Sequence, residues 1–135
     1  MKRLFFLSVF VLVTSLTSVF GFTFQRSLYN SPQIPDSEDR QKLFTFFPAT
    51  RFVYVNMYAY RGGNDTYECA RCVVGSYNRQ TGAQYYYNYL FAQQPHQSAS
   101  YSGWVTMAPA GVGYRLEVEL FCFSPYDYAY IYLYW

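Results

Sequence analysis

The chain has little charge and few of the side chains on which catalysis usually depends. Of its 135 residues, 13% are Asp, Glu, Lys or Arg, and there are only 1 histidine and 3 cysteines. The histidine, His96, follows Pro95 in a polar stretch that is typical of a solvated loop. No serine stands in the G-x-S-x-G context of a hydrolase nucleophile. We therefore expect no enzymatic activity, no cofactor and no metal site.

Residues 1–21 have the pattern of a secretory signal peptide. Lys2 and Arg3 precede an apolar stretch over residues 4–13, and Gly21 ends an acceptable cleavage site. The apolar stretch is shorter than the ~20 residues that a bilayer-spanning helix needs, so we expect cleavage and secretion rather than an uncleaved anchor. Removing Lys2 and Arg3 lowers the basic residues from 10 to 8, against 8 acidic ones. The mature chain of about 114 residues is then nearly neutral, which predicts no nucleic-acid partner and no membrane partner after cleavage.

The three cysteines, Cys69, Cys72 and Cys122, predict one disulfide and one spare thiol in an oxidising compartment. In an extended stretch, the Cα atoms of Cys69 and Cys72 would be about 10 Å apart, beyond the ~7 Å limit for a bridge. Their C-x-x-C spacing also lacks the helix N-terminus that redox chemistry uses. We expect Cys122 to pair with either Cys69 or Cys72. The remaining cysteine is then either buried or joins two chains into a dimer.

Beyond the signal peptide, the sequence predicts a loose leader over residues 22–36 and a single β-rich domain over residues 37–135. The leader shows no clear period and contains Pro32 and Pro35. One short helix is expected over residues 37–44, because Asp36 or Ser37 can cap its N-terminus and acidic residues precede basic ones.

The rest of the domain is expected to be all-β. Six strands are predicted over residues 51–61, 67–77, 84–92, 101–107, 114–123 and 128–135. Because no helix of crossover length separates them, the strands should be antiparallel. A small barrel fits this pattern best, and a β-sandwich is the alternative.

Tyrosine is the abundant residue, with 17 in the chain. Successive side chains in a strand point to opposite faces, so residues 126–135 place tyrosines on one face and Ala129, Ile131 and Leu133 on the other. We expect this aliphatic face to point to the core, and the Val53, Val55 and Met57 face of residues 52–60 to do the same. The tyrosines then form a covering or contacting surface rather than the lining of a pocket.

Two acidic residues, Glu117 and Glu119, alternate with apolar residues along one predicted strand. They either face solvent opposite a core face, or lie inside a barrel and bind a cationic ligand that offsets the cost of burying them. Trp104 is either a core residue or a platform for an organic cation. If a ligand pocket exists, its candidate contacts are Tyr58, Tyr87, Trp104, Glu117 and Glu119.

A predicted turn carries an N-glycosylation acceptor, Asn64-Asp65-Thr66. Since this turn would lie in a secreted chain, we expect Asn64 to be glycosylated.

The first half of the domain carries residues that are familiar from one secreted family. They are Asp39-Arg40-Gln41-Lys42-Leu43-Phe44, Arg51-Phe52-Val53-Tyr54-Val55, residues 58–61, Asp65 shortly before Cys69, and the Tyr-rich stretch 84–91. This part of the chain resembles the tick salivary lipocalins, which include the histamine-binding proteins. The resemblance implies an eight-stranded barrel, secreted in tick saliva, that holds a biogenic amine or a lipid mediator of host defence. The chain differs from the family in its expected six strands, in the missing second disulfide and in Trp135, which no cysteine closely precedes.

Two functions follow as expectations. The first is a secreted lipocalin-like carrier, in a shortened barrel, that sequesters an amine or lipid mediator. The second is a secreted protein–protein interaction or adhesive module that has no ligand pocket and contacts a host protein or another copy through its Tyr-rich surfaces.

Overall fold

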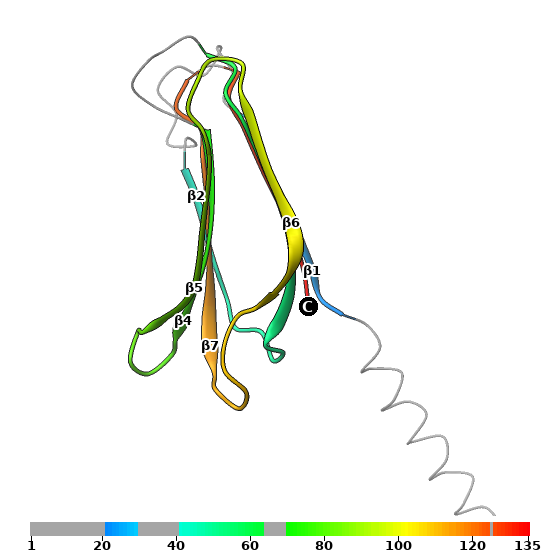
Figure 1. Ribbon diagram of the computed structural model, residues 1–135, viewed down its shortest axis with the longest axis vertical. Helices are drawn as coiled ribbons and strands as arrows, with labels where there is room; N and C mark the ends of the chain where they lie inside the picture. The colour runs from blue at the N-terminus through cyan, green and yellow to red at the C-terminus, as the bar shows by residue number, and fades with distance from the viewer. Residues whose placement is uncertain (1–20, 30–40, 64–69, 125) are drawn as a thin grey trace, which may run out of the picture.

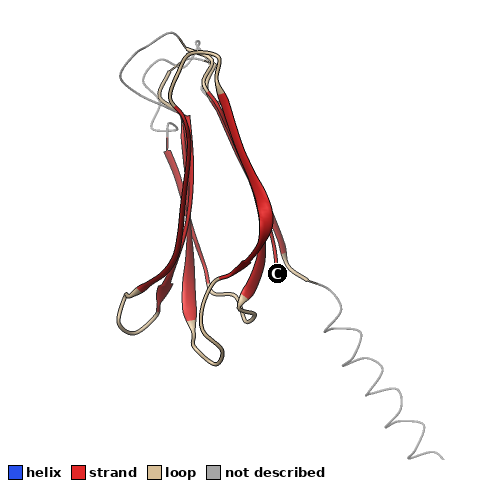
Figure 2. Ribbon diagram, viewed as in Figure 1, coloured by secondary structure: helices blue, strands red, loops and turns tan. Residues whose placement is uncertain are grey.

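A computed structural model describes residues 21–29, 41–63, 70–124 and 126–135. Its architecture is shown in Figure 1. The strands are β1 (Thr23–Tyr29), β2 (Gln41–Phe46), β3 (Phe52–Tyr60), β4 (Ala70–Asn78), β5 (Gln84–Ala92), β6 (Ser98–Thr106), β7 (Tyr114–Phe121) and β8 (Tyr128–Tyr134). Figure 2 shows these strands joined by loops, with no helix in the described part of the chain. The all-β class is confirmed.

The strands form two four-stranded antiparallel sheets, in the orders β1-β8-β3-β6 and β2-β7-β4-β5. Early strands pair with late ones: β1 with β8, β2 with β7, β3 with β6, and β4 with β5. The chain is therefore arranged as one long hairpin, and every connection except β4 to β5 passes from one sheet to the other. The two sheets face each other in Figure 1, and no closed barrel is seen among the described strands.

The alternating pattern of each strand decides which side chains enter the space between the sheets. In β3, Val53, Val55 and Met57 are completely buried. In β8, Ile131 and Leu133 are also completely buried, and the tyrosines between them are only partly buried. The predicted inward direction of both aliphatic faces is confirmed.

Both sheets contribute to one core. Its largest aliphatic members include Met57, Leu116, Leu120, Ile131 and Leu133. Burying a side chain of this size contributes roughly 1.5–3 kcal/mol relative to leaving it in water. Since β8 and β7 belong to different sheets and both supply such residues, the core holds the two sheets together.

The expected helix over residues 37–44 is wrong where the structure describes it. Residues 41–44 belong to β2, which pairs with β7 from Gln41 opposite Phe121 to Phe46 opposite Leu116. Phe44 and Phe46 pack against the core, so burial against β7 outweighs the helix-capping signals at Asp36 and Ser37. Residues 37–40 lie outside the described part of the chain.

The expected loose leader is also wrong for residues 23–29. This segment is β1, an edge strand whose register with β8 runs from Thr23 opposite Tyr134 to Tyr29 opposite Tyr128. Phe24 and Leu28 supply its buried side chains. The domain therefore begins before residue 37.

The Cys72–Cys122 alternative for the disulfide is not formed, and both residues are buried free thiols. The register explains this result. Cys72 lies opposite Leu120, so Cys122 is its diagonal neighbour, at a typical Cα separation of about 7–8 Å that exceeds bridge geometry. The Cys69–Cys122 alternative lies outside the described residues, as do Asn64 and nearly all of the predicted signal peptide.

Candidate interaction surface

The outer face of sheet β1-β8-β3-β6 is rich in aromatic residues and has no charge among its described strand residues. We call it the Tyr face. By strand alternation, its members are Thr23, Gln25, Ser27 and Tyr29 of β1; Tyr128, Tyr130, Tyr132 and Tyr134 of β8; Phe52, Tyr54, Asn56, Tyr58 and Tyr60 of β3; and Ser98, Ser100, Ser102, Trp104 and Thr106 of β6. The polar members are hydroxyl and amide side chains, which can hydrogen-bond but carry no charge.

Aromatic contacts run across the strands of the Tyr face. The ring of Tyr54 meets Trp104 edge-on, with the centroids 5.7 Å apart, and meets Tyr132 at 6.4 Å. The ring of Trp104 also meets the ring of Tyr134, with the centroids 5.9 Å apart. Such tilted pairs contribute about 0.5–1.5 kcal/mol beyond their area burial. They also fix the rings in place, while Trp104 remains 61% exposed.

One end of the Tyr face is hollowed. A shallow depression of about 340 Å³ is lined by Tyr29, Tyr58, Tyr60, Tyr126 and Tyr128. Tyr58 and Tyr128 contact each other with their centroids 6.0 Å apart. Tyr29 and Tyr126 are each 54% exposed, so much of their surface can still be covered by another molecule.

The outer face of sheet β2-β7-β4-β5 has a different chemistry, and we call it the ion-pair face. Arg71 Nη2 lies 2.5 Å from Glu119 Oε1, and Arg115 Nε lies 2.6 Å from Glu117 Oε1. Burial lowers the pKa of Arg71, but its hydrogen bond with Glu119 and the charge of Glu119 together raise it above its ordinary value. Each arginine also stacks on a ring, Arg71 on Phe121 and Arg115 on Tyr77.

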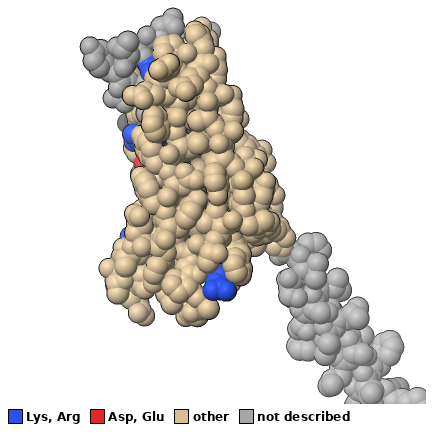
Figure 3. Space-filling model, in the orientation of Figure 1, with Lys and Arg blue, Asp and Glu red and all other residues tan. Residues whose placement is uncertain are grey.

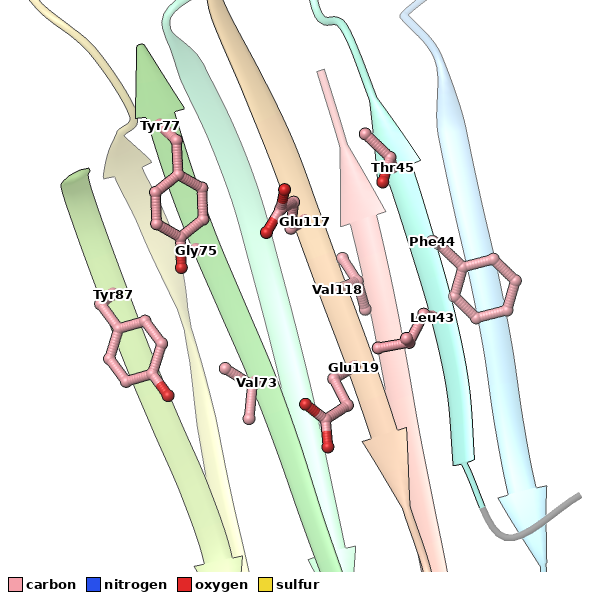
Figure 4. A pocket seen from close by; sticks show the side chains of 10 residues that line it. All are labelled: Leu43, Phe44, Thr45, Val73, Gly75, Tyr77, Tyr87, Glu117, Val118 and Glu119. Carbon is pink, nitrogen blue, oxygen red and sulfur yellow. The ribbon is translucent and has the colours of Figure 1, made fainter. Parts of the chain in front are cut away.

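A trough of about 380 Å³ runs along the ion-pair face, as Figure 4 shows. Tyr87 of β5 and Tyr77 of β4 border it on one side, and Glu117 and Glu119 project from β7 beside them. Tyr77 lies over Gly75, where a Cβ atom would come within 2.6 Å of its hydroxyl oxygen. Burial raises the pKa of Tyr77, and the negative charge of Glu117 adds to that effect.

The structure divides the five predicted ligand contacts between the two faces. Tyr87, Glu117 and Glu119 line the trough of the ion-pair face. Tyr58 and Trp104 lie on the Tyr face, on the other sheet. Glu117 and Glu119 therefore do not face the space between the sheets, which leaves the solvent-facing alternative.

Among the described residues, the completely buried carboxylate is that of Asp127, which directly precedes β8 and is hydrogen-bonded to backbone N–H groups. Its Oδ1 accepts hydrogen bonds from the N–H groups of Gly62 and Gly63, at 3.0 and 3.4 Å, and its Oδ2 accepts one from Ser124 at 2.8 Å. Asp127 therefore fixes two loops in place and has little capacity left for a cationic ligand.

The two described thiols are buried and poorly nucleophilic. Burial raises the pKa of Cys72 to about 12 and raises that of Cys122 as well. The Sγ atom of Cys72 contacts the carbonyl oxygens of Tyr58 and Tyr130, at 3.2 and 3.3 Å. Among the described residues, no group of three or more His, Cys, Asp or Glu side chains could hold a metal ion.

The sequence offered Tyr58 and Trp104 as contacts of a possible pocket, and Trp104 alternatively as a core residue, which is wrong because that residue is 61% exposed. It did not show that Tyr54 contacts both Trp104 and Tyr132. The alternation within each strand was visible, but the order of β8, β3 and β6 in one sheet was not. The sequence analysis also did not identify the arginine partners of the two glutamates. Arg71 could not be matched to Glu119 because the two residues lie on different strands, β4 and β7.

Comparison with known proteins identifies no family for this chain. No protein-family model matches the chain, and a search of curated proteins finds no match. Within the described residues, no helix is long and apolar enough to cross a membrane.

Proposed function

We propose that the protein is a secreted interaction module that binds another protein through its Tyr face. The observation that carries this proposal is the outward direction of the tyrosines on β3 and β8, on a sheet face without charge among its described residues. Protein interfaces are enriched in Tyr and Trp, and charged residues are depleted at their cores. A Tyr ring also loses little conformational entropy when it is fixed in a complex.

The finer fold that we propose is a two-layer β-sandwich with the strand order of a jelly roll. The pairing of β1 with β8, β2 with β7, β3 with β6, and β4 with β5 supports it, because this is the pattern of a long hairpin rolled into two sheets. In an up-and-down barrel, consecutive strands would pair instead. Buried side chains from both sheets pack into one cluster between them, which favours contact through the outer faces over uptake of a ligand between the sheets.

Secretion is part of the proposal and rests on the signal-peptide pattern of residues 1–21. An outward face of neutral Tyr, Ser and Asn side chains suits an extracellular partner that is recognised by shape and hydrogen bonds. We expect such binding to depend little on salt, since few charges take part.

The test is binding of the purified protein to an array of extracellular proteins, measured at low and high salt. We expect saturable binding to at least one member, with an affinity that changes less than about threefold across the salt range. Saturable binding that disappears at high salt would favour the ion-pair face instead. Absence of binding to every member of a broad array would count against the proposal.

A second candidate is a small-ligand carrier, favoured by the fact that Tyr87, Glu117 and Glu119 line one trough. A biogenic amine there would compete with Arg71 and Arg115, which already neutralise both carboxylates. Isothermal titration with histamine, serotonin and a leukotriene distinguishes the two candidates. Saturable heat that Glu119→Gln removes would support the carrier, and the absence of heat with all three would exclude it for these ligands.

A further inference from the structure

Strand β6 is an open edge of the Tyr-face sheet with none of the usual protection against pairing. It ends the order β1-β8-β3-β6, and its sequence Ser-Ala-Ser-Tyr-Ser-Gly-Trp-Val-Thr contains no charge and no proline. Its register with β3 is unbroken from Phe52 opposite Thr106 to Tyr60 opposite Ser98. Soluble proteins commonly protect such edges with charged residues, proline or bulges. Figure 1 shows β6 on the near side of the molecule, and in the same orientation Figure 3 shows the visible charged side chains along the left edge and near the lower end, away from β6.

The free backbone groups of β6 can be assigned from its two ends. Gln97 O accepts from Arg61 N at 3.0 Å, and Met107 N donates to Arg51 O at 2.7 Å, so the odd-numbered positions at both ends bond toward β3. Hydrogen-bonded and non-hydrogen-bonded positions alternate along an antiparallel strand. The N–H and C=O groups of the even-numbered residues 98, 100, 102, 104 and 106 therefore point away from β3.

The sequence of β6 is complementary to itself in one antiparallel register. With Ser102 at the centre, all nine residues of the strand overlap with a second copy. Trp104 then lies opposite Ser100, Tyr101 opposite Gly103, and Val105 opposite Ala99, so every bulky side chain faces a small one. The residues with free backbone groups also face one another, which allows a regular ladder.

The other three edge strands do not share these properties. The central residue of β1 is Arg26, so the same self-pairing would place two guanidinium groups opposite each other. Strand β2 carries Lys42. Strand β5 joins β4 through a register shift, and self-pairing would bring its tyrosines against one another, Tyr87 opposite Tyr89.

We propose that two copies of the chain pair through their β6 strands, antiparallel and centred on Ser102, so that sheet β1-β8-β3-β6 continues across a two-fold axis. Pairing would satisfy the free backbone groups at the edge and join two Tyr faces into one surface. This dimer stands apart from the proposed function, because it uses the sheet edge and would form whether or not the Tyr face binds another protein.

The first test is the oligomeric state by sedimentation equilibrium. We expect the wild-type protein to be a dimer. Ser102→Lys places two ammonium groups together at the axis, and we expect it to raise the dissociation constant at least about tenfold. The matched control is Ser27→Lys, an exposed serine on the same face but on the opposite edge strand, β1. It should leave the dimer unchanged.

The second test detects the register directly. Ser102→Cys brings two new thiols together at a Cα separation of about 5.5 Å, within bridge geometry. We expect a reducible covalent dimer on mild oxidation, and none for Ser27→Cys. A monomeric wild type, a dimer that Ser102→Lys does not weaken, or cross-linking through Ser27→Cys instead would each overturn the proposal.

Discussion

The outer face of sheet β1-β8-β3-β6 presents Tyr58, Tyr130 and Trp104 without a charge among its described strand residues, whereas the outer face of sheet β2-β7-β4-β5 presents the pairs Arg71–Glu119 and Arg115–Glu117. Both faces cover the same core and arise from the same alternation of side chains. The charges of the ion-pair face are already neutralised within the face. The described strand residues of the Tyr face carry no charge, so a partner can cover its exposed rings without removing an ion from water.

The largest expected effect is the loss of folding stability at high pH, because the buried groups beneath both faces then ionise. Burial raises the pKa of Cys72 from 9.0 to about 12, and that of Tyr114 from 10.0 to about 12. Because these folded-state values lie above the unfolded ones, the unfolded chain loses its protons first as the pH rises. The contribution to stability is complete below about pH 9 and is lost toward pH 12, and it is on the order of 4 kcal/mol for Cys72 alone.

Urea unfolding between about pH 8 and pH 12 measures this loss. Cys72→Val removes one titrating group and should make the decline shallower than in the wild type. A free energy of unfolding that stays constant up to pH 11 would show that the thiol is not buried as described.

The next effect tests whether the two faces rest on one cooperative core. Ile131 lies beneath the Tyr face and Leu120 beneath the ion-pair face, and both are completely buried. Truncation of either to Ala leaves a cavity and should cost about 2–5 kcal/mol. Chemical denaturation should show a single transition for both variants. Two separate transitions, or a cost below about 1 kcal/mol at one site, would mean that the sheets unfold independently.

A smaller effect on stability is expected from removing one ion pair of the ion-pair face. Arg71→Met leaves Glu119 without its partner, and since the pair is only partly buried we expect a loss of up to about 1 kcal/mol. That loss should shrink at high salt. The matched change on the Tyr face, Tyr132→Phe, should alter stability by less than about 0.5 kcal/mol at any salt concentration. A salt-dependent effect of Tyr132→Phe would remove the distinction between the two faces.

Much of the strand pattern could be predicted, because alternation is a local signal. Strand Gln84–Ala92 was predicted with the observed bounds, and the inward faces of β3 and β8 were read from Val53, Val55, Ile131 and Leu133. The two missed strands are both sheet edges. In β1, the two buried residues Phe24 and Leu28 stand four positions apart with the exposed Arg26 between them, so the period of two is weak.

The features of the fold that the sequence did not predict depend on pairing between segments that are distant in the chain. β1 is held by β8, and β2 by β7, and neither partner is near in sequence. The same limit applies to the candidate site. Trp104, Tyr54 and Tyr134 come together only because β6, β3 and β8 are neighbours in one sheet. The Cys72–Cys122 disulfide does not form because Cys72 faces Leu120, two residues before Cys122, and this offset depends on the register between β4 and β7.

The central claim is that the Tyr face is the contact surface. Its most direct test compares Tyr58→Glu on that face with Tyr87→Glu on the ion-pair face, in binding to an extracellular protein identified on the array. Both variants should remain folded and unfold in a single thermal transition, because both side chains lie on outer faces. Tyr58→Glu also loses the ring contact with Tyr128, so we expect it to cost up to about 1.5 kcal/mol of stability. The account predicts that Tyr58→Glu weakens binding by at least about 30-fold, equivalent to about 2 kcal/mol, and that Tyr87→Glu changes it less than about threefold. Equal affinity for Tyr58→Glu and the wild type, or a loss confined to Tyr87→Glu, would contradict it.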